Sequence, residues 1–138
     1  MSRFILDASV AFKSLVIESD SEMAARLIED YRNGVHELIA PGILPIEVGH
    51  ALTRAERVGR ISTTEGFTLW SAMMADCPLL FPSLSLMPRA YVLSSVMRLG
   101  IYDCLYVALS EQEGCEIVSD DARLASLFPM HVFPLSSL

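Results

Sequence analysis

The amino-acid sequence predicts an α/β fold in which five short strands form a parallel sheet and seven helices pack around it. Short apolar runs alternate with longer segments of helical periodicity along the chain, which is the pattern of repeated strand–helix units. Four helical patterns end at a glycine, as is usual at helix exits: Gly34, Gly59, Gly100 and Gly114. With 138 residues, 52 % of them hydrophobic, the chain is expected to form one domain over residues 1–138 with its own core.

The first half of the chain is expected to contain two strands and four helices. In order, they are a strand at 4–6, helices at 9–17 and 20–32, a strand at 37–40, and helices at 42–58 and 62–76. Ser19 and Glu22 have the spacing of a capping box at the start of the second helix. Ser62 and Glu65 have the same spacing at the start of the fourth helix, so both positions predict helix starts.

The second half continues the alternation of strands and helices. We expect a strand at 79–81, helices at 88–99 and 103–113, a strand at 116–118, a helix at 120–127 and a last strand at 132–133. Aspartates stand at two of these boundaries: Asp103 where a helix begins, and Asp120 with Asp121 where a strand ends. The two tyrosines beside Asp103, Tyr102 and Tyr106, are expected to pack in the core rather than to stack on nucleotides.

The composition bears on partners and on the cellular compartment. A net charge of −7 and a pI of about 4.8 argue against binding nucleic acid, because phosphate-binding domains are usually basic. A cluster of carboxylates that binds a divalent metal weakens this objection, because the metal reverses the local charge. The mean hydropathy of +0.43 is high for a lone domain, which suggests that a partner or a second copy covers apolar surface.

The sequence contains no sign of secretion or of a membrane span. The three cysteines are far apart and form no Cys-x-x-Cys pair, which favours the reducing cytoplasm over a disulfide framework. Only three apolar residues precede the first aspartate, too few for a signal-peptide core. No apolar run approaches the ~20 residues that a membrane helix requires. We therefore expect a cytoplasmic protein with no membrane partner.

Each acid that ends or borders an element also has a structural explanation. Asp7 and Asp103 have the position of helix N-caps, and Glu47 lies at the border of the apolar face of its helix, where a solvated glutamate is common. Either Asp120 or Asp121 could cap the last helix. In a sheet of order 3-2-1-4-5, however, the ends of the first and fourth strands face each other at the point where ligands bind. Clustered carboxylates repel one another, and Mg²⁺, or Mn²⁺ in its place, would remove that penalty.

Four segments, taken together, resemble the successive motifs of PIN domains, and more narrowly of the VapC-type toxins of type II toxin–antitoxin systems. They are Phe-Ile-Leu-Asp-Ala-Ser at 4–9, Pro-Gly-Ile-Leu-Pro-Ile-Glu-Val at 41–48, Ile-Tyr-Asp-Cys-Leu-Tyr-Val-Ala-Leu-Ser at 101–110, and Ile-Val-Ser-Asp-Asp-Ala-Arg-Leu at 117–124. The resemblance implies a three-layer α/β/α fold, Mg²⁺-dependent cleavage of RNA, frequent homodimers, and inhibition by a cognate antitoxin protein.

The resemblance also assigns roles to individual residues. The acids of the metal site are Asp7, Glu47, Asp103 and Asp121. Ser9 and Ser119 match the hydroxyl positions beside the first and last acids, and Ser119 stands where threonine is commoner. Asp120 fills a variable position, so the choice between Asp120 and Asp121 as the metal-facing acid stays open. His50 stands where related chains often carry asparagine.

The chemistry expected of such a site is phosphodiester hydrolysis by metal-activated water. Asp7 and Asp103 are expected to bind the metal directly, with Glu47 and Asp121 binding directly or through water. Three arginines at the end of the helix at 42–58 are candidates for phosphate contacts, although they could equally complement the helix terminus: Arg54, Arg57 and Arg60.

Three other kinds of protein compete with this interpretation. A phosphate-receiver domain needs a late lysine, and the only lysine is Lys13. A haloacid-dehalogenase phosphatase needs a second acid two residues after Asp7, where Ser9 stands. A catalytically silent PIN fold that binds RNA or protein is the remaining alternative.

The helix at 62–76 carries the expectation about partners. One stripe of side chains at three- and four-residue spacing is expected to be largely buried: Phe67, Trp70, Met74 and Cys77. Met73 falls off this stripe, so we expect apolar surface near it to contact another chain. The helices at 42–58 and 62–76 are expected to form a groove for an antitoxin segment, close to a surface for self-association.

Overall fold

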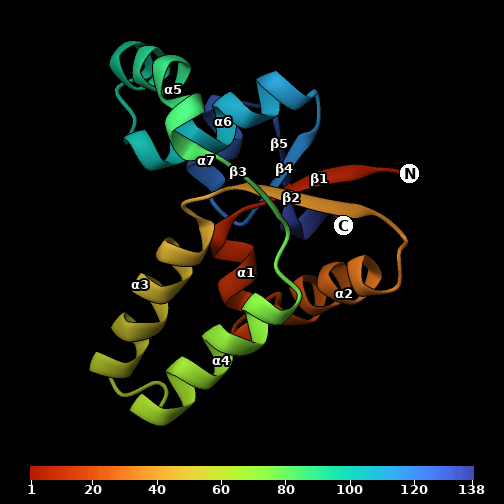
Figure 1. Cartoon of the computed structure of the whole chain (residues 1–138), viewed down its shortest axis with the longest axis vertical. Helices are drawn as coiled ribbons and strands as arrows, with labels where there is room; N and C mark the ends of the chain where they lie inside the picture. The colour runs from red at the N-terminus through yellow and green to blue at the C-terminus, as the bar shows by residue number, and fades with distance from the viewer.

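The structure is a computed structural model that describes residues 1–138. Its strands are β1 (Arg3–Leu6), β2 (Glu37–Pro41), β3 (Leu79–Phe81), β4 (Glu116–Ser119) and β5 (Val132–Pro134). They form one parallel sheet in the order β3-β2-β1-β4-β5, which confirms the predicted α/β class and strand order. The central strand β1 pairs with β2 on one side and with β4 on the other, so that the ends of these three strands lie together (Figure 1).

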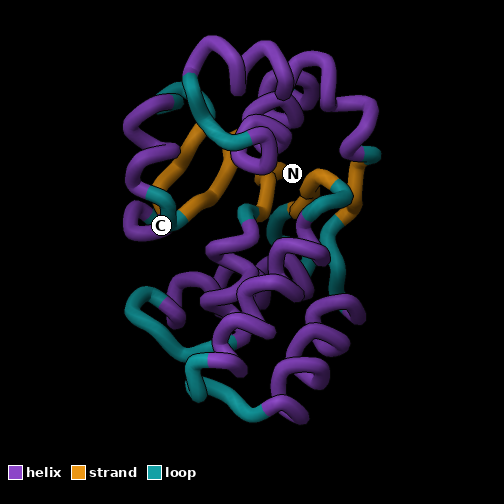
Figure 2. Tube along the Cα trace, turned by 90° about the vertical axis from the view of Figure 1, so that its left-hand side faces the viewer, coloured by secondary structure: helices purple, strands orange, loops and turns teal.

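Helices cover both faces of the sheet, which confirms the three-layer arrangement. They are α1 (Ala8–Leu15), α2 (Ser21–Arg32), α3 (Leu44–Arg57), α4 (Thr63–Ala75), α5 (Ser83–Met97), α6 (Ile101–Glu113) and α7 (Ala122–Leu127), followed by a 3-10 turn η1 (Leu135–Ser137). The strands lie between two groups of helices in Figure 2. In Figure 1, α1 to α4 lie below the strands, and α5 and α6 lie above them.

Alternating side chains of β1 divide the core into two layers. Ile5 belongs to the cluster that α5, α6 and α7 cover, whereas Leu6 belongs to the cluster that α1, α2, α3 and α4 cover. Successive side chains of a strand point to opposite faces, and β1 is buried on both faces because it is the central strand. This burial fixes the register of the sheet, and therefore the position of the residue that follows β1.

Two capping boxes were expected, and one of them forms. The Ser62 side chain accepts from the Glu65 backbone N–H, and the Glu65 side chain accepts in return from the Ser62 N–H. The expected box of Ser19 and Glu22 is wrong. Asp20 is the N-cap of α2 instead, in the left-handed conformation (φ 65°) and without a side-chain capping bond, so Ser19 lies outside the helix.

All seven helix starts lie within five residues of the prediction, and for two of them the difference has a structural consequence. α5 begins at Ser83 rather than at 88, and Pro88 lies inside it. A proline inside a helix leaves the carbonyl four residues earlier without its usual donor. Here that residue is Leu84, which is exposed to solvent. α6 begins at Ile101 with Gly100 as its N-cap, so Asp103 lies in the first turn and is not the cap.

The expected inward stripe of α4 is right for Trp70 and Cys77, which are partly buried, and wrong for its other two members. Phe67 and Met74 are exposed, whereas Met73 is buried in the core, so the free apolar surface is not at Met73. The buried face includes Gly66, which lies so close to the Glu56 side chain of α3 that a β-carbon would overlap it. A glycine contributes no hydrophobic signal to the sequence pattern, and the predicted stripe was therefore displaced by one position.

No single helix is long and apolar enough to cross a membrane. Only α5 and α6 taken as a pair have the required length and composition, and they are bent by 118° relative to each other. Seven consecutive residues of α6, from 104 to 110, are buried inside the fold.

Candidate active site

Two segments that carry aspartates meet at the carboxyl edge of the sheet. Asp7 directly follows β1, and Asp120 with Asp121 directly follow β4. Because β1 and β4 pair in parallel, these segments lie side by side, at the edge where open α/β sheets bind their ligands. The Asp7 side chain is buried there. Asp7 occupies the N-cap position of α1, but its side chain makes no capping hydrogen bond.

Two serine hydroxyls connect Asp7 to the segment after β4. Ser9 and Ser119 both donate to Oδ2 of Asp7, at 2.5 Å and 2.8 Å. The Ser9 hydroxyl accepts in turn from the backbone N–H of Asp120 (3.2 Å), and the Ser119 hydroxyl accepts from that of Asp121 (3.0 Å). Each serine therefore joins the first acid to the backbone of the last acidic pair, and both were among the predicted site residues.

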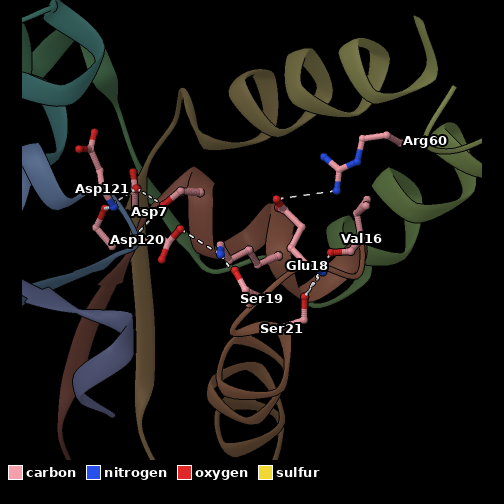
Figure 3. Close-up of polar contacts among 11 residues, drawn as sticks. Asp7, Val16, Glu18, Ser19, Ser21, Arg60, Asp120 and Asp121 are labelled. Carbon is pink, nitrogen blue, oxygen red and sulfur yellow. Dashed lines mark hydrogen bonds and ion pairs between the residues drawn. The ribbon is translucent and has the colours of Figure 1, made fainter. Parts of the chain in front are cut away.

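The side chains of Asp120 and Asp121 face different partners. Asp120 pairs with Nζ of Lys13 at 3.0 Å, and Lys13 also donates to the carbonyl of Ser19 at 2.7 Å. Oδ1 of Asp121 caps α7 by accepting two backbone N–H bonds. The two carboxylates point in opposite directions in Figure 3. The charge of Asp121 contributes to the raised pKa of Asp103, whereas the charge of Asp120 is paired with Lys13.

Glu47 extends from the first turn of α3 towards α6 and is fixed there by a tyrosine. The hydroxyl of Tyr106 donates to Oε1 of Glu47 at 2.7 Å, and the Tyr106 side chain is completely buried. Tyr106 lies three residues after Asp103 on the same side of α6. Its packing role was predicted, but its role as a hydrogen-bond donor to the site was missed.

Burial and mutual repulsion perturb three of the acids. Burial raises the pKa of Glu47 to about 7, opposed by the Tyr106 bond and increased further by the charges of Asp7 and Asp103. Burial raises the pKa of Asp103 to about 6, with further contributions from Asp7 and Asp121. Burial also raises the pKa of Asp7, against the lowering effect of its two serine bonds. The charge of Arg123 lowers the pKa of Asp103 and opposes these effects only in part, so the site concentrates negative charge.

The chemistry of these side chains fits a hard divalent cation. All four acids offer carboxylate oxygens, the donors that Mg²⁺ and Mn²⁺ prefer. Glu47 and Asp121 each have one oxygen held by hydrogen bonds within the chain, and both serine bonds of Asp7 fall on its Oδ2. In this arrangement, however, no group of three or more His, Cys, Asp or Glu side chains is close enough to hold an ion. Binding would thus require the carboxylates to converge or to bind through water.

An open cleft of about 650 Å³ extends from these acids between α1 and α3. Ser9, Glu47 and Asp120 line its acidic end, and Phe12 and His50 line it further along the helices. His50, one turn after Glu47, is therefore a cleft residue. A cavity of this size is in the usual range for small-ligand sites.

The three candidate arginines do not lie in the same surroundings. Arg54 and Arg57 are exposed on α3 and do not line the cleft. The guanidinium of Arg60 lies 5.7 Å from the ring centre of Phe12 and 3.7 Å from Oε2 of Glu18, beside the far end of the cleft (Figure 3). Of the three, Arg60 is therefore the one that contacts cleft residues.

Known proteins resemble this chain along nearly its whole length. The PIN domain family model matches residues 4–127. Ribonuclease VapC3 of Pyrobaculum aerophilum is 29 % identical over 138 residues, which cover 96 % of this chain and 99 % of that protein. The crystal structure of PAE2754 from Pyrobaculum aerophilum matches with a TM-score of 0.71 at 18 % identity, over 99 % of this chain and 91 % of that one. At this identity the structural match speaks for the fold alone.

The family match includes the four segments that surround the carboxylates. It begins within β1, just before Asp7, and ends with α7, after Asp121. The fold, the strand order and the family match all agree with the motifs read from the sequence. The chain therefore belongs to the PIN-domain family and is a VapC-type PIN protein.

Proposed function

We propose that this chain is a Mg²⁺-dependent endoribonuclease that hydrolyses RNA phosphodiester bonds, with Mn²⁺ as a possible substitute metal, and that it is the toxin of a type II toxin–antitoxin pair. The observation that carries the proposal is that four acids from four separate segments lie near enough at one edge of the sheet for their charges to raise the pKa values of Glu47 and Asp103: Asp7, Glu47, Asp103 and Asp121. The name of the relative from Pyrobaculum aerophilum, a ribonuclease, supports the same activity.

In this proposal Asp7 and Asp103 hold the metal, and Glu47 and Asp121 bind it directly or through water. A bound divalent metal lowers the pKa of water and neutralises charge on the phosphate. The chain's own hydrogen bonds orient the acids. The two serines hold one oxygen of Asp7, Tyr106 holds one oxygen of Glu47, and the second oxygen of Glu47 stays free for the metal or its water.

The partners proposed with this function are an RNA substrate, a cognate antitoxin protein and a second copy of the chain. An apolar groove of about 270 Å³ lies between α3 and α4, beside the exposed Phe67 and the half-buried Trp70. This groove supports the expected binding of an antitoxin segment. A basic side chain of that segment, placed among the acids, would supply the charge that the metal otherwise provides.

Cleavage of an RNA with Mg²⁺, with Mn²⁺ and with EDTA tests the enzymatic part. Asp7→Asn and Asp103→Asn should abolish metal-dependent cleavage while the far-ultraviolet circular dichroism stays unchanged, because asparagine is nearly the same size and also suits a helix start. Asp30→Asn, on α2 away from the cleft, is the matched control. Full cleavage in EDTA, or wild-type rates in both site variants, would contradict the proposal and favour a catalytically silent binding module.

A further inference from the structure

The wall of the cleft beside the acids is made of three large apolar side chains, two of which are exposed to solvent. Ile43, Ile46 and Tyr102 form this wall, which we call the Tyr102 wall. Ile46 directly precedes Glu47 and is 67 % exposed, and Tyr102 directly precedes Asp103 and is 59 % exposed. The expectation that Tyr102 packs in the core is therefore wrong, whereas Tyr106, one turn later, is buried.

The exposure of Tyr102 follows from its place on α6. The helix buries the continuous segment 104–110 against the sheet and α5, and Tyr102 lies before that segment, at the end of the helix that reaches the cleft. Apolar side chains gathered at a cleft usually mark a binding surface. An aromatic ring in such a place offers a flat face on which another flat group can stack.

The charges around the Tyr102 wall decide what kind of group can lie on it. The wall itself carries no charged side chain, Glu47 and Asp120 line the same cleft, and Asp103 follows Tyr102 in the sequence. The one lysine of the cleft, Lys13, is already paired with Asp120. A phosphate on this wall would therefore lie among more carboxylates than cations, whereas an uncharged flat ring carries no charge that they repel.

Resting on the ribonuclease function proposed above, we propose that the Tyr102 wall binds one unpaired nucleobase next to the phosphate that is cleaved. Nucleobases stack on aromatic side chains with little dependence on sequence, and proteins that recognise RNA commonly take up bases from loops and single strands in this way. A base inside a duplex is already stacked and paired, so it cannot lie on the wall.

Fluorescence of 2-aminopurine tests base stacking separately from hydrolysis. A short unpaired RNA that contains one 2-aminopurine is titrated with the Asp7→Asn protein in Mg²⁺, which leaves the RNA intact, and the emission should fall as the base stacks. In the Asp7→Asn protein, a second substitution, Tyr102→Ala, should weaken RNA binding roughly 5- to 100-fold, which is the effect of losing one base–aromatic stack. Tyr102→Phe in the same protein should leave RNA binding unchanged. Tyr91→Ala removes a tyrosine that is 66 % exposed on α5, outside the cleft, and is the matched control.

The cleavage assay supplies the second readout. In the otherwise wild-type protein, Tyr102→Ala should raise KM for unpaired RNA more than it lowers kcat, and a fully paired RNA should be cut poorly by both proteins. Equal quenching of 2-aminopurine by the Tyr102→Ala and Tyr91→Ala proteins would overturn the inference. It would also be overturned if Tyr102→Ala weakened only the binding of a protein inhibitor and left RNA binding unchanged. If the wild-type protein and Tyr102→Ala cleave unpaired RNA equally well, only the base site is refuted. If quenching depends on Tyr102 but the wild-type protein cleaves no RNA with any metal, only the proposed ribonuclease activity is refuted.

Discussion

The ion pair of Lys13 and Asp120 leads to an asymmetric prediction for stability. The Lys13 side chain is only 8 % exposed and that of Asp120 is 33 % exposed, at a distance of 3.0 Å. Removing the partner of a buried charge leaves that charge without compensation, which is costly. Asp120→Ala leaves the buried ammonium with only the carbonyl of Ser19, whereas Lys13→Met leaves a carboxylate that water already reaches.

The magnitudes follow from this difference in burial. Breaking a buried pair costs about 3–5 kcal/mol, and the partial exposure of Asp120 reduces the cost of Asp120→Ala to about 2–3 kcal/mol. Lys13→Met should cost about 1 kcal/mol, since methionine keeps most of the packing and the remaining carboxylate is hydrated. For a chain of 138 residues, 1 kcal/mol corresponds to roughly 3.5 °C in Tm. We therefore expect losses of roughly 7–10 °C for Asp120→Ala and roughly 3–4 °C for Lys13→Met.

Thermal unfolding of the two single variants and the double variant measures this. The double variant should melt close to Lys13→Met, because no uncompensated charge is left in it. The exposed pair of Arg89 and Glu111 is the control, and Glu111→Ala should change Tm only slightly. A larger loss for Lys13→Met than for Asp120→Ala, or a double variant that loses the sum of both, would refute the reasoning.

Three further predictions concern the acids themselves. Because the pKa values of Glu47 (about 7) and Asp103 (about 6) are raised, the metal-free folded state holds protons that the unfolded state has lost. The Tm measured in EDTA should therefore fall as the pH rises from 5 to 8. A Glu47→Gln variant whose Tm falls just as steeply with pH would contradict this. Tyr106→Phe removes the hydrogen bond that lowers the pKa of Glu47. Titration with Mn²⁺ at pH 7 should then show an affinity for the metal that is at least about 10-fold weaker. If the tyrosine only packs in the core, the affinity for Mn²⁺ should not change. Asp121→Asn should stop cleavage while Asp120→Asn keeps most of it, and the reverse result would assign Asp120 to the metal.

The sequence predicts most of the fold because the fold depends on local signals. Strand β1 is short and apolar, and three of the four glycines predicted to end helices do so: Gly34, Gly59 and Gly114. The prediction for Gly100 is wrong, because α5 ends at Met97 with Arg98 as its C-cap, and Gly100 is the N-cap of α6. The errors arise where tertiary contacts override those signals. Gly66 shows no hydrophobic preference in the sequence, yet it is buried against the Glu56 side chain of α3. The buried face of α4 includes Gly66 and Met73 rather than Met74, and a pattern based on hydrophobic residues gives no weight to the glycine.

The site was predictable where an acid ends an element and not where a side chain acts across the fold. Asp7 and the pair after β4 follow strand ends, and their proximity follows from the strand order. The roles of Tyr106 and Lys13 depend on partners that are far away in the sequence. Glu47 lies 59 positions before Tyr106, and Asp120 lies 107 positions after Lys13. One signal did exist for Lys13, because it is the only lysine and lies on the helix that directly follows the first acid.

These cross-fold contacts explain how one segment can turn two adjacent carboxylates towards different neighbours. Lys13 pairs with Asp120 at the acidic end of the cleft, and the capping bonds hold Asp121 over the start of α7. If both carboxylates were unpaired beside Asp7 and Asp103, each further charge would raise the pKa values of the others and favour their protonated forms. A metal would then have to displace more protons in order to bind. In the site proposed above, Lys13 therefore acts by neutralising the charge of Asp120 rather than by adding a ligand.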